Sequence, residues 1–197
     1  LEIDRNGVSI IGDPTVDSGP SSGGRAVATV PRMITSALRT LQRRRFREPL
    51  PLESRGTSRR VPDFPLAACV VDTEFIPVEQ ELRVREVWIS LACGRILDRR
   101  RAEQRVEQEV FLALGHALTE LRFPDRVADR QTLENYVPAV LFQLPRIRMQ
   151  FVEDDRDPLP VTGLAMHVVP AAVVNAVSQA GGVFLDRIPA TPSLLLE

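Results

Sequence analysis

Lysine is absent from this chain of 197 residues, so all 25 basic side chains are arginines. One interpretation is the mutational bias of a GC-rich genome. The other is selection for the planar, bidentate donors that arginine offers at an interface. Acidic residues nearly balance the arginines, and the formal net charge is -1. The overall charge therefore does not indicate a nucleic-acid-binding protein, and nucleic acid is not expected as a partner.

Cysteine is scarce as well, because the chain holds only Cys69 and Cys93. Two cysteines so far apart form neither a disulfide framework nor a CxxC metal site, and both are interpreted as buried thiols. No stretch reaches the roughly 18 apolar residues of a membrane span, and no signal peptide is visible. These absences predict a cytoplasmic protein that has no membrane span and no metal ligands of its own.

The chain does contain enough apolar material for one sizeable core, at 44% hydrophobic residues. Its 16 prolines divide it into short elements. We predict two parts. Residues 1–63 hold an N-terminal loop, an amphipathic helix and an Arg/Pro-rich linker, and residues 64–197 form the main domain.

The predicted N-terminal helix begins near Gly24, where apolar residues start to recur at helical spacing. They are Val27, Val30, Ile34, Leu38 and Leu41. Pro31 falls inside this helix unless the helix begins there. Between residues 37 and 60, eight arginines stand against two glutamates. This segment is either a solvated, flexible arm or a surface that binds an anion or a partner.

The main domain is predicted to begin with a β-hairpin, because apolar residues alternate over residues 66–75 and again over 82–91. The alternation slips near Glu86, which indicates a β-bulge. Residues 102–121 carry an apolar stripe typical of a helix, with acidic residues in the first half.

Two shorter elements are predicted in the last third of the chain. Residues 147–152 read as a strand, followed by an acidic loop over 153–157. Pro170 is well placed as the first residue of a helix that stops at Gly181. The predicted fold class is α+β, with antiparallel strands packed against a few helices.

Several short segments of the main domain follow one another in a recognisable order. They are residues 69–75 paired with 84–88, ACGRILD at 92–98, ALGHALTE at 113–120, NYVP at 135–138, and PAAVVNAV at 170–177 followed by LDRIPATP at 185–192. In order and spacing, residues 64–195 resemble the C-terminal molybdopterin-binding portion of molybdenum hydroxylases, the xanthine dehydrogenase and aldehyde oxidase family. Residues 12–45 show a weaker resemblance, in which Arg25 falls on the family's Ser-Arg helix start.

The resemblance aligns residues 158–166 with the family's catalytic loop, which ends in Gly-x-Gly-Glu. That glutamate takes a proton from a molybdenum-bound hydroxyl. Here Gly163 keeps the first glycine, Ala165 replaces the second and Met166 replaces the glutamate. A thioether has no lone pair with the proton affinity that a general base needs. The neighbouring His167 is interpreted as non-catalytic, so no catalytic residue is predicted.

The helix start that contacts the pterin in this family departs as well. The family has Gln-x-Glu-Gly-Gly, and this chain has RVEQE at residues 105–109. Two glycines that permit close backbone approach have become bulkier side chains. Arg105 is either a ligand of a pterin phosphate or pyrophosphate, or a surface arginine. The resemblance thus leaves four cofactor-binding candidates, which are Arg25, Arg105, Gly163 and Ala165.

The resemblance implies a non-catalytic subunit or half-domain of a molybdenum-hydroxylase-like oxidoreductase complex, and whether the chain is an enzyme stays open. Molybdopterin, the molybdenum cofactor, is expected only together with a partner chain. The implied partners are a complementary large-subunit half and iron–sulfur and flavin subunits, since an isolated half exposes apolar surface that its partner covers.

Three other interpretations stay open. The chain could be a split molybdenum hydroxylase subunit that is active only with a partner chain. It could be a domain that has been reused to bind an anion or a protein. It could also be one segment of a longer polypeptide.

Overall fold

The computed structural model describes residues 7–12, 15, 22–56, 64–76, 78–79, 81–120, 139–140 and 144–192. The chain divides into two compact units, Leu1–Pro62 and Asp63–Glu197, each with its own internal packing. The segment NYVP at 135–138, which contributed to the resemblance, lies outside the described residues.

The first unit is built on helix α1 (Arg25–Arg44), which begins directly after Gly24 as predicted and runs through Pro31. It contains no acidic residue, and Ala28 is its one buried side chain. The apolar face is open to a large extent, with Val27 42% and Val30 47% exposed. At the helix end, Arg44 Nη1 donates to the Glu53 carbonyl oxygen at 3.0 Å, which ties the following segment to the helix.

The second unit contains a sheet of three strands in the order β1-β2-β3. Strands β1 (Leu66–Ile76) and β2 (Glu81–Ala92) pair antiparallel, as the hairpin prediction requires. Asp72 lies opposite Glu86, whereas Thr73 lies opposite Val84, so Arg85 is the extra residue. The predicted bulge is therefore confirmed, and it lets the inward-facing set of β2 change register.

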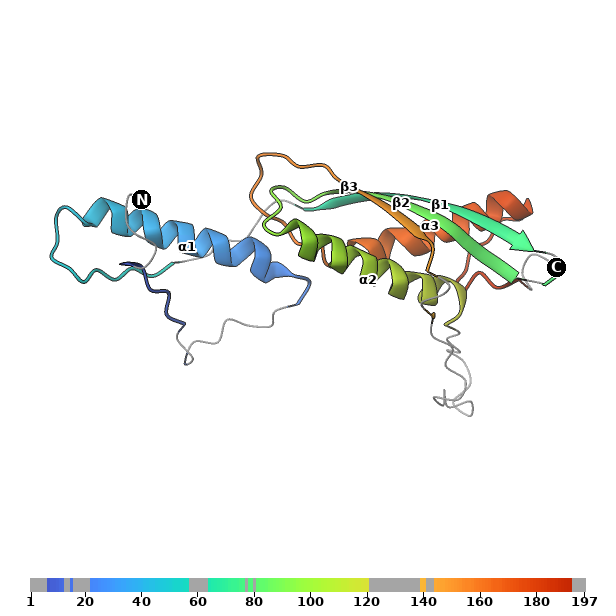
Figure 1. The fold of residues 1–197 in the computed structure, drawn as a ribbon, viewed down its shortest axis with the longest axis horizontal. Helices are drawn as coiled ribbons and strands as arrows, with labels where there is room; N and C mark the ends of the chain where they lie inside the picture. Colours follow the sequence, from blue (N-terminus) through green and yellow to red (C-terminus); the bar gives the residue numbers. More distant parts are fainter. Residues whose placement is uncertain are drawn as a thin grey trace. The chain divides into compact units, whose positions relative to one another are not determined.

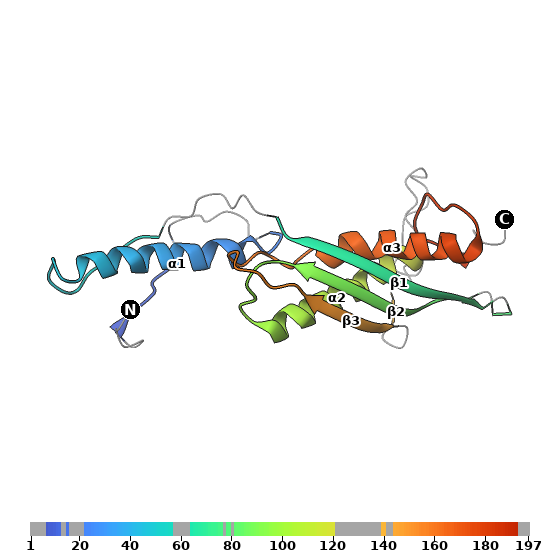
Figure 2. The same cartoon turned by 90° about the horizontal axis from the view of Figure 1, so that it is seen from above.

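Strand β3 (Arg146–Phe151) is the part of the sheet that the sequence predicted wrongly, because it runs parallel to β2 rather than antiparallel. A parallel neighbour needs a long crossover connection. Helix α2 (Arg99–Leu118) lies in that connection. The α+β class is confirmed, with α2 and α3 (Leu164–Gly181) on one face of the sheet (Figures 1 and 2).

The two helices of this unit begin earlier than predicted. Asp98 is the N-cap of α2 and accepts a hydrogen bond from the Arg101 N–H at 3.0 Å, which fixes the start at Arg99. Helix α3 begins at Leu164, so Pro170 lies inside it and is not its first residue. The start is set by Gly163, whose φ of 90° is a left-handed conformation that favours glycine. The end at Gly181 is as predicted.

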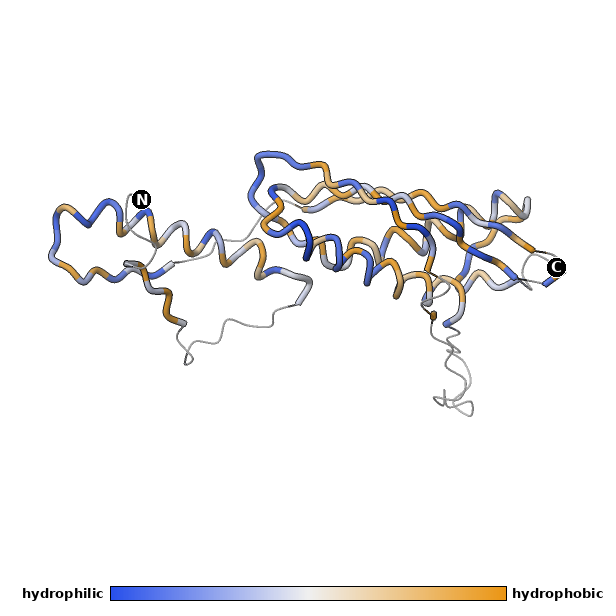
Figure 3. Tube along the Cα trace, in the orientation of Figure 1, coloured by the Kyte–Doolittle hydropathy of each residue, from blue (hydrophilic) through white to orange (hydrophobic). Residues whose placement is uncertain are grey.

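The core lies between the sheet and the helices. On β2, Val87, Ile89 and Leu91 are at most 2% exposed, and they face α2 and α3. The helices contribute a second set of buried apolar residues: Val106, Val110, Ala113 and Leu114 from α2, and Val169, Val173 and Val177 from α3. Figure 3 shows the contrast within α2, whose first half is mostly hydrophilic and whose second half is mostly hydrophobic.

Helix α3, with 18 residues, is long and apolar enough to cross a membrane by length and composition. It packs against both β1 and α2 in this unit. This packing buries one stripe of the helix, which consists of Ala165, Val169, Pro170, Val173 and Val177.

The two cysteines differ in burial, and burial raises the pKa of both thiols. Cys93 is buried, as predicted, and Cys69 is half-buried on β1. Loss of solvation raises the pKa of Cys69 to about 11. The pKa of Cys93 is also raised, chiefly by burial. Neither thiol therefore has the lowered pKa of a reactive cysteine.

The outer face of the sheet is covered by no described helix of the second unit, since α2 and α3 both lie on the inner face. Leu66 and Val70 on β1 are each 65% exposed, and Trp88 on β2 is 38% exposed. Glu86 and Arg148 form an ion pair across β2 and β3 beside them. This face is an apolar patch with a charged border.

Candidate functional site

The loop after β3 brings the start of α3 to the first half of α2. This loop runs beside the residues that follow β2, with Val152 N–H bonded to Leu91 O at 2.8 Å and Leu159 N–H to Cys93 O at 2.9 Å. Gly94 makes the close approach possible. Its φ is +68°, and a Cβ there would lie 2.5 Å from the Asp157 carbonyl oxygen.

Glu109 of α2 is the centre of this site. It is 2% exposed and is the one buried charged side chain among the described residues. Its two carboxylate oxygens accept the Gly163 N–H at 2.8 and 2.9 Å. Arg105, one turn earlier on α2, donates from Nε to the same carboxylate at 3.0 Å. The pair reaches from the interior to the surface, because the Arg105 side chain is 43% exposed.

The carboxylate of Glu109 acts as a cap for a helix other than its own. Helix α3 has no acidic residue in its first turn and no side-chain cap at Gly163. The N-terminus of a helix carries a partial positive charge and unpaired N–H groups. Glu109 satisfies the Gly163 N–H and places a negative charge there. Burying a carboxylate is costly unless it is hydrogen-bonded and paired, and here it is both.

The structure joins two of the predicted site residues and separates the others. Arg105 and Gly163 both bind Glu109. Ala165 is fully buried, so its methyl group belongs to the core. Arg25 lies in the other unit, at the first position of α1.

The residues of the first turn of α3 offer little for catalysis. Met166 is half-buried there. His167 is exposed, with Nε2 3.9 Å from the place of a Cβ on Gly163. Neither side chain is a carboxylate. The turn therefore supplies no acidic group that could take up a proton.

Glu109 is the site residue that sequence reasoning missed. The resemblance identifies it only as a bulkier side chain in place of a glycine. The helix prediction identifies it only as one of the acidic residues in the first half of the helix. The signal that could have found it is its spacing. Val106, Glu109 and Ala113 share one stripe of α2, and that stripe is the buried one. A charged residue on a buried stripe needs partners in the interior.

The residues of this site do not fit a bound pterin phosphate. Two of the four cofactor-binding candidates, Arg105 and Gly163, offer donors at this site, from the guanidinium and from the backbone N–H. Both already bind the carboxylate of Glu109. A phosphate placed there would meet that buried negative charge. No group of three His, Cys, Asp or Glu side chains that could hold a metal ion occurs within the described ranges.

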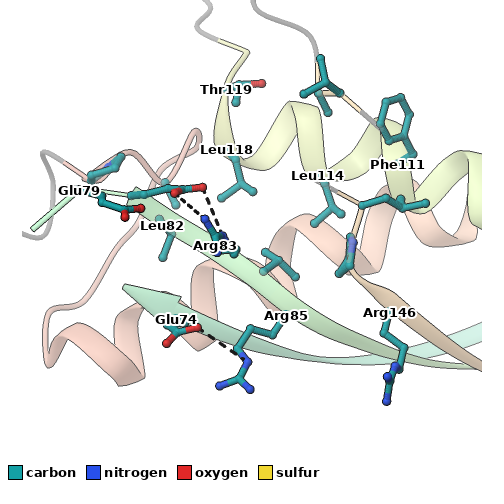
Figure 4. A pocket seen from close by; sticks show the side chains of 18 residues that line it. Glu74, Glu79, Leu82, Arg83, Arg85, Phe111, Leu114, Leu118, Thr119 and Arg146 are labelled. Atoms are coloured by element: carbon teal, nitrogen blue, oxygen red, sulfur yellow. Dashed lines mark hydrogen bonds and ion pairs between the residues drawn. The ribbon is translucent and has the colours of Figure 1, made fainter. Parts of the chain in front are cut away.

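A hollow of about 1060 Å³ lies beside the C-terminal end of α2 (Figure 4). Leu114 and Leu118 of α2 and Leu82 of β2 line its apolar part. Three glutamates and three arginines lie on its border, and two of these arginines interact with glutamates of the same border. Arg83 binds Glu81 at 2.8 Å, and Arg85 lies 3.9 Å from Glu74. Because these charges neutralise one another, the hollow has no evident preference for a charged ligand.

Comparison with known sequences places this chain near a molybdenum-binding subunit. No protein-family model matches the chain. The aldehyde oxidoreductase molybdenum-binding subunit PaoC of Escherichia coli is 32% identical over 127 residues, which cover 59% of this chain. The chain spans only 17% of the length of that subunit.

Comparison with solved structures confirms the fold. Quinoline 2-oxidoreductase from Pseudomonas putida matches with a TM-score of 0.53 and 23% identity, over 59% of this chain and 16% of that one. Aldehyde oxidoreductase from Desulfovibrio desulfuricans gives 0.53 and 18% identity, over 60% and 14%. The Cu,Mo-CO dehydrogenase gives 0.54 and 14%, over 68% and 18%. The resemblance to molybdenum hydroxylases is therefore confirmed in part of the chain, by sequence similarity and by fold.

Proposed function

We propose that this chain is a non-catalytic half-domain of a molybdenum-hydroxylase-like oxidoreductase assembly, which it completes by docking to a separate chain. The observation that carries the proposal is Met166 in the first turn of α3, where the related loop has its glutamate. Residues 163–169 contain no carboxylate. The nearest acid on α2, Glu109, has both oxygens engaged by Gly163. The first turn of α3 therefore lacks a free carboxylate that could act as the base.

Size and surface support the docking part of this proposal. The chain spans 17% of the length of the molybdenum-binding subunit that it resembles, and the proposal assigns the rest of such a subunit to the partner. The outer sheet face carries Val70, which is 65% exposed, and Trp88, which is 38% exposed. Exposed apolar patches with a polar border are typical of protein interfaces. In this proposal molybdopterin, iron–sulfur and flavin groups come with the partner chains, in a cytoplasmic complex.

Two alternatives have an observation in their favour. A split hydroxylase whose base comes from another chain is favoured by the exposed position of His167 and by the half-burial of Met166, which leave the start of α3 accessible. A reused binding module is favoured by α1, which has five arginines and no acidic residue over Arg25–Arg44. The metal content and the salt dependence of binding separate these alternatives.

The test is a native purification of the full chain from its source, with mass spectrometry and molybdenum analysis of the same fraction. The proposal predicts co-elution with a chain that resembles the rest of the large subunit. It also predicts that Val70→Arg on the outer sheet face abolishes this co-elution. The control is Val78→Arg, since Val78 is 96% exposed in the β1–β2 turn. A chain that elutes alone, or equal loss in both variants, contradicts docking through the sheet.

The metal analysis decides between the proposal and the split enzyme. A preparation that keeps its partner chains but contains neither molybdenum nor pterin excludes the split hydroxylase, whereas bound molybdenum together with turnover of an aldehyde or heterocycle supports it. A chain that binds DNA or an acidic protein at low salt, and loses binding when the arginines of α1 are replaced by glutamine, is a reused module.

A further inference from the structure

We infer that Glu109 is an internal anion that keeps the cofactor-facing donors of this chain permanently occupied. Two donors from different elements converge on its carboxylate, the Gly163 N–H at the start of α3 and the Arg105 Nε on α2. Convergence of a guanidinium and a helix N-terminus on one point is the arrangement that binds phosphate-like anions. In this chain the anion at that point is covalently part of α2.

Because Glu109 is buried, its contacts with the two donors are part of the packed interior. The side chain is 2% exposed, although it stands on a helix whose first half is mostly hydrophilic. Its neighbours along the buried stripe are Val106 and Val110, both 0% exposed. A carboxylate at such a place is stable only while both donors stay bound to it. An external anion therefore competes with a ligand that is already fixed in position.

The residue type explains how the replacement works. The related motif has a glycine where this chain has Glu109, and a glycine leaves the space at the start of α3 open. Glutamate fills that space and brings its own negative charge. Glu109 thus connects α2 with Gly163 through its own carboxylate. The start of α3 is therefore expected to stay folded against α2 without any bound cofactor.

The inference rests on the proposed function in one respect, namely that the chain holds no working cofactor by itself. Its test uses the purified full chain and inorganic phosphate, so it needs no partner and no molybdenum. The melting temperature is measured against phosphate concentration, with chloride at equal ionic strength as reference. Glu109→Gly is expected to gain a phosphate-dependent rise of about 3 °C at ten times the dissociation constant. The unchanged protein and Glu109→Gln, which keeps the volume, are expected to show no such rise.

A second variant shows that the gain depends on both donors. Adding Arg105→Gln to Glu109→Gly is expected to remove the phosphate effect. Equal phosphate effects in the unchanged protein and in Glu109→Gly overturn the inference, while the outcome of the native purification stays unaffected. Conversely, a metal-free chain that elutes alone overturns the docking proposal and leaves the role of Glu109 in place.

If Glu109→Gly does not fold, amide exchange at Gly163 tests the same contact. In the unchanged protein this N–H is bonded to a buried carboxylate and is expected to exchange slowly. In Glu109→Gln the charge is lost, and exchange is expected to be roughly tenfold faster. Equal exchange rates at Gly163 in the two proteins overturn the inference.

Discussion

We divide helix α2 at Glu109 into a first half, residues 99–109, and a second half, residues 110–118, and the two differ in how far they match the related motif. The second half buries Ala113, Leu114 and Ala117 against the core. It matches the related motif at Gly115 and Ala117, and it has Ala113 in place of that motif's first glycine. The first half has Gln108 and Glu109 in place of two glycines, and Glu109 turns inward to bind the start of α3. The half that builds the core kept its pattern, whereas the half that would face a cofactor changed. A helix can therefore keep the packing of its relatives while the residues that decide its chemistry change.

The largest expected effect lies in the second half of α2. Leu114 is 4% exposed, and Leu114→Ala leaves a cavity beneath the sheet. We expect a loss of about 2–5 kcal/mol in the free energy of unfolding. Leu112, on the same half of the helix, is 47% exposed and serves as the control. Urea denaturation checks both variants, and a Leu112→Ala variant that loses as much stability as Leu114→Ala contradicts the assigned buried face.

The next effect concerns the changed half. Glu109→Ala removes the partner of the Gly163 N–H and of Arg105, and we expect a loss of about 1–3 kcal/mol. The loss stays below that of a fully buried ion pair, because Arg105 is 43% exposed and can be solvated. The matched control is Glu107→Ala, since Glu107 is exposed two residues away. The measurement is thermal unfolding of the two variants. Equal losses of stability would show that the contacts of Glu109 contribute no more than an exposed glutamate on the same helix.

Elements with strong periodicity could be predicted from the sequence. The hairpin, its bulge and the second half of α2 each have an apolar pattern that packing then uses directly. Their residues bury the same face that the pattern marked, because local periodicity and the core agree there. The same agreement explains why the resemblance to molybdenum hydroxylases can be recognised in the sequence alone.

The parts that failed depend on contacts distant in the sequence. Pro170 has the properties of a first helical residue, but the left-handed turn at Gly163 starts α3 earlier. Strand β3 is parallel to β2 because of the crossover through α2, and no local signal encodes that direction. Glu109 is 54 residues from Gly163 in the sequence, so the bond between them follows only from the packed fold.

A smaller effect is expected at the start of α2. Asp98 caps this helix through the Arg101 N–H, and Asp98→Ala should cost about 1 kcal/mol. Asp186 is 72% exposed and bonded only to its neighbour Arg187, so Asp186→Ala is the matched control. If thermal unfolding shows no difference between the two variants, the first turn of α2 contributes nothing to stability. The comparison between its halves then reduces to Glu109 alone.

The smallest expected effect on stability comes from restoring the residue that Met166 replaces. Met166→Glu puts a carboxylate in the first turn of α3, where the helix dipole favours it by about 0.3–1 kcal/mol. The carboxylate of Glu109 opposes this gain, since it already binds the Gly163 N–H at the same helix end. The net change in thermal unfolding should therefore stay within about 1 kcal/mol. Molybdenum in the native preparation should not rise either, because Glu109 still occupies both donors. Only the combination with Glu109→Gly also removes the carboxylate that binds Arg105 and the Gly163 N–H. A rise in bound molybdenum with Met166→Glu alone would mean that the base, and not the occupied donor pair, is what separates this chain from its catalytic relatives.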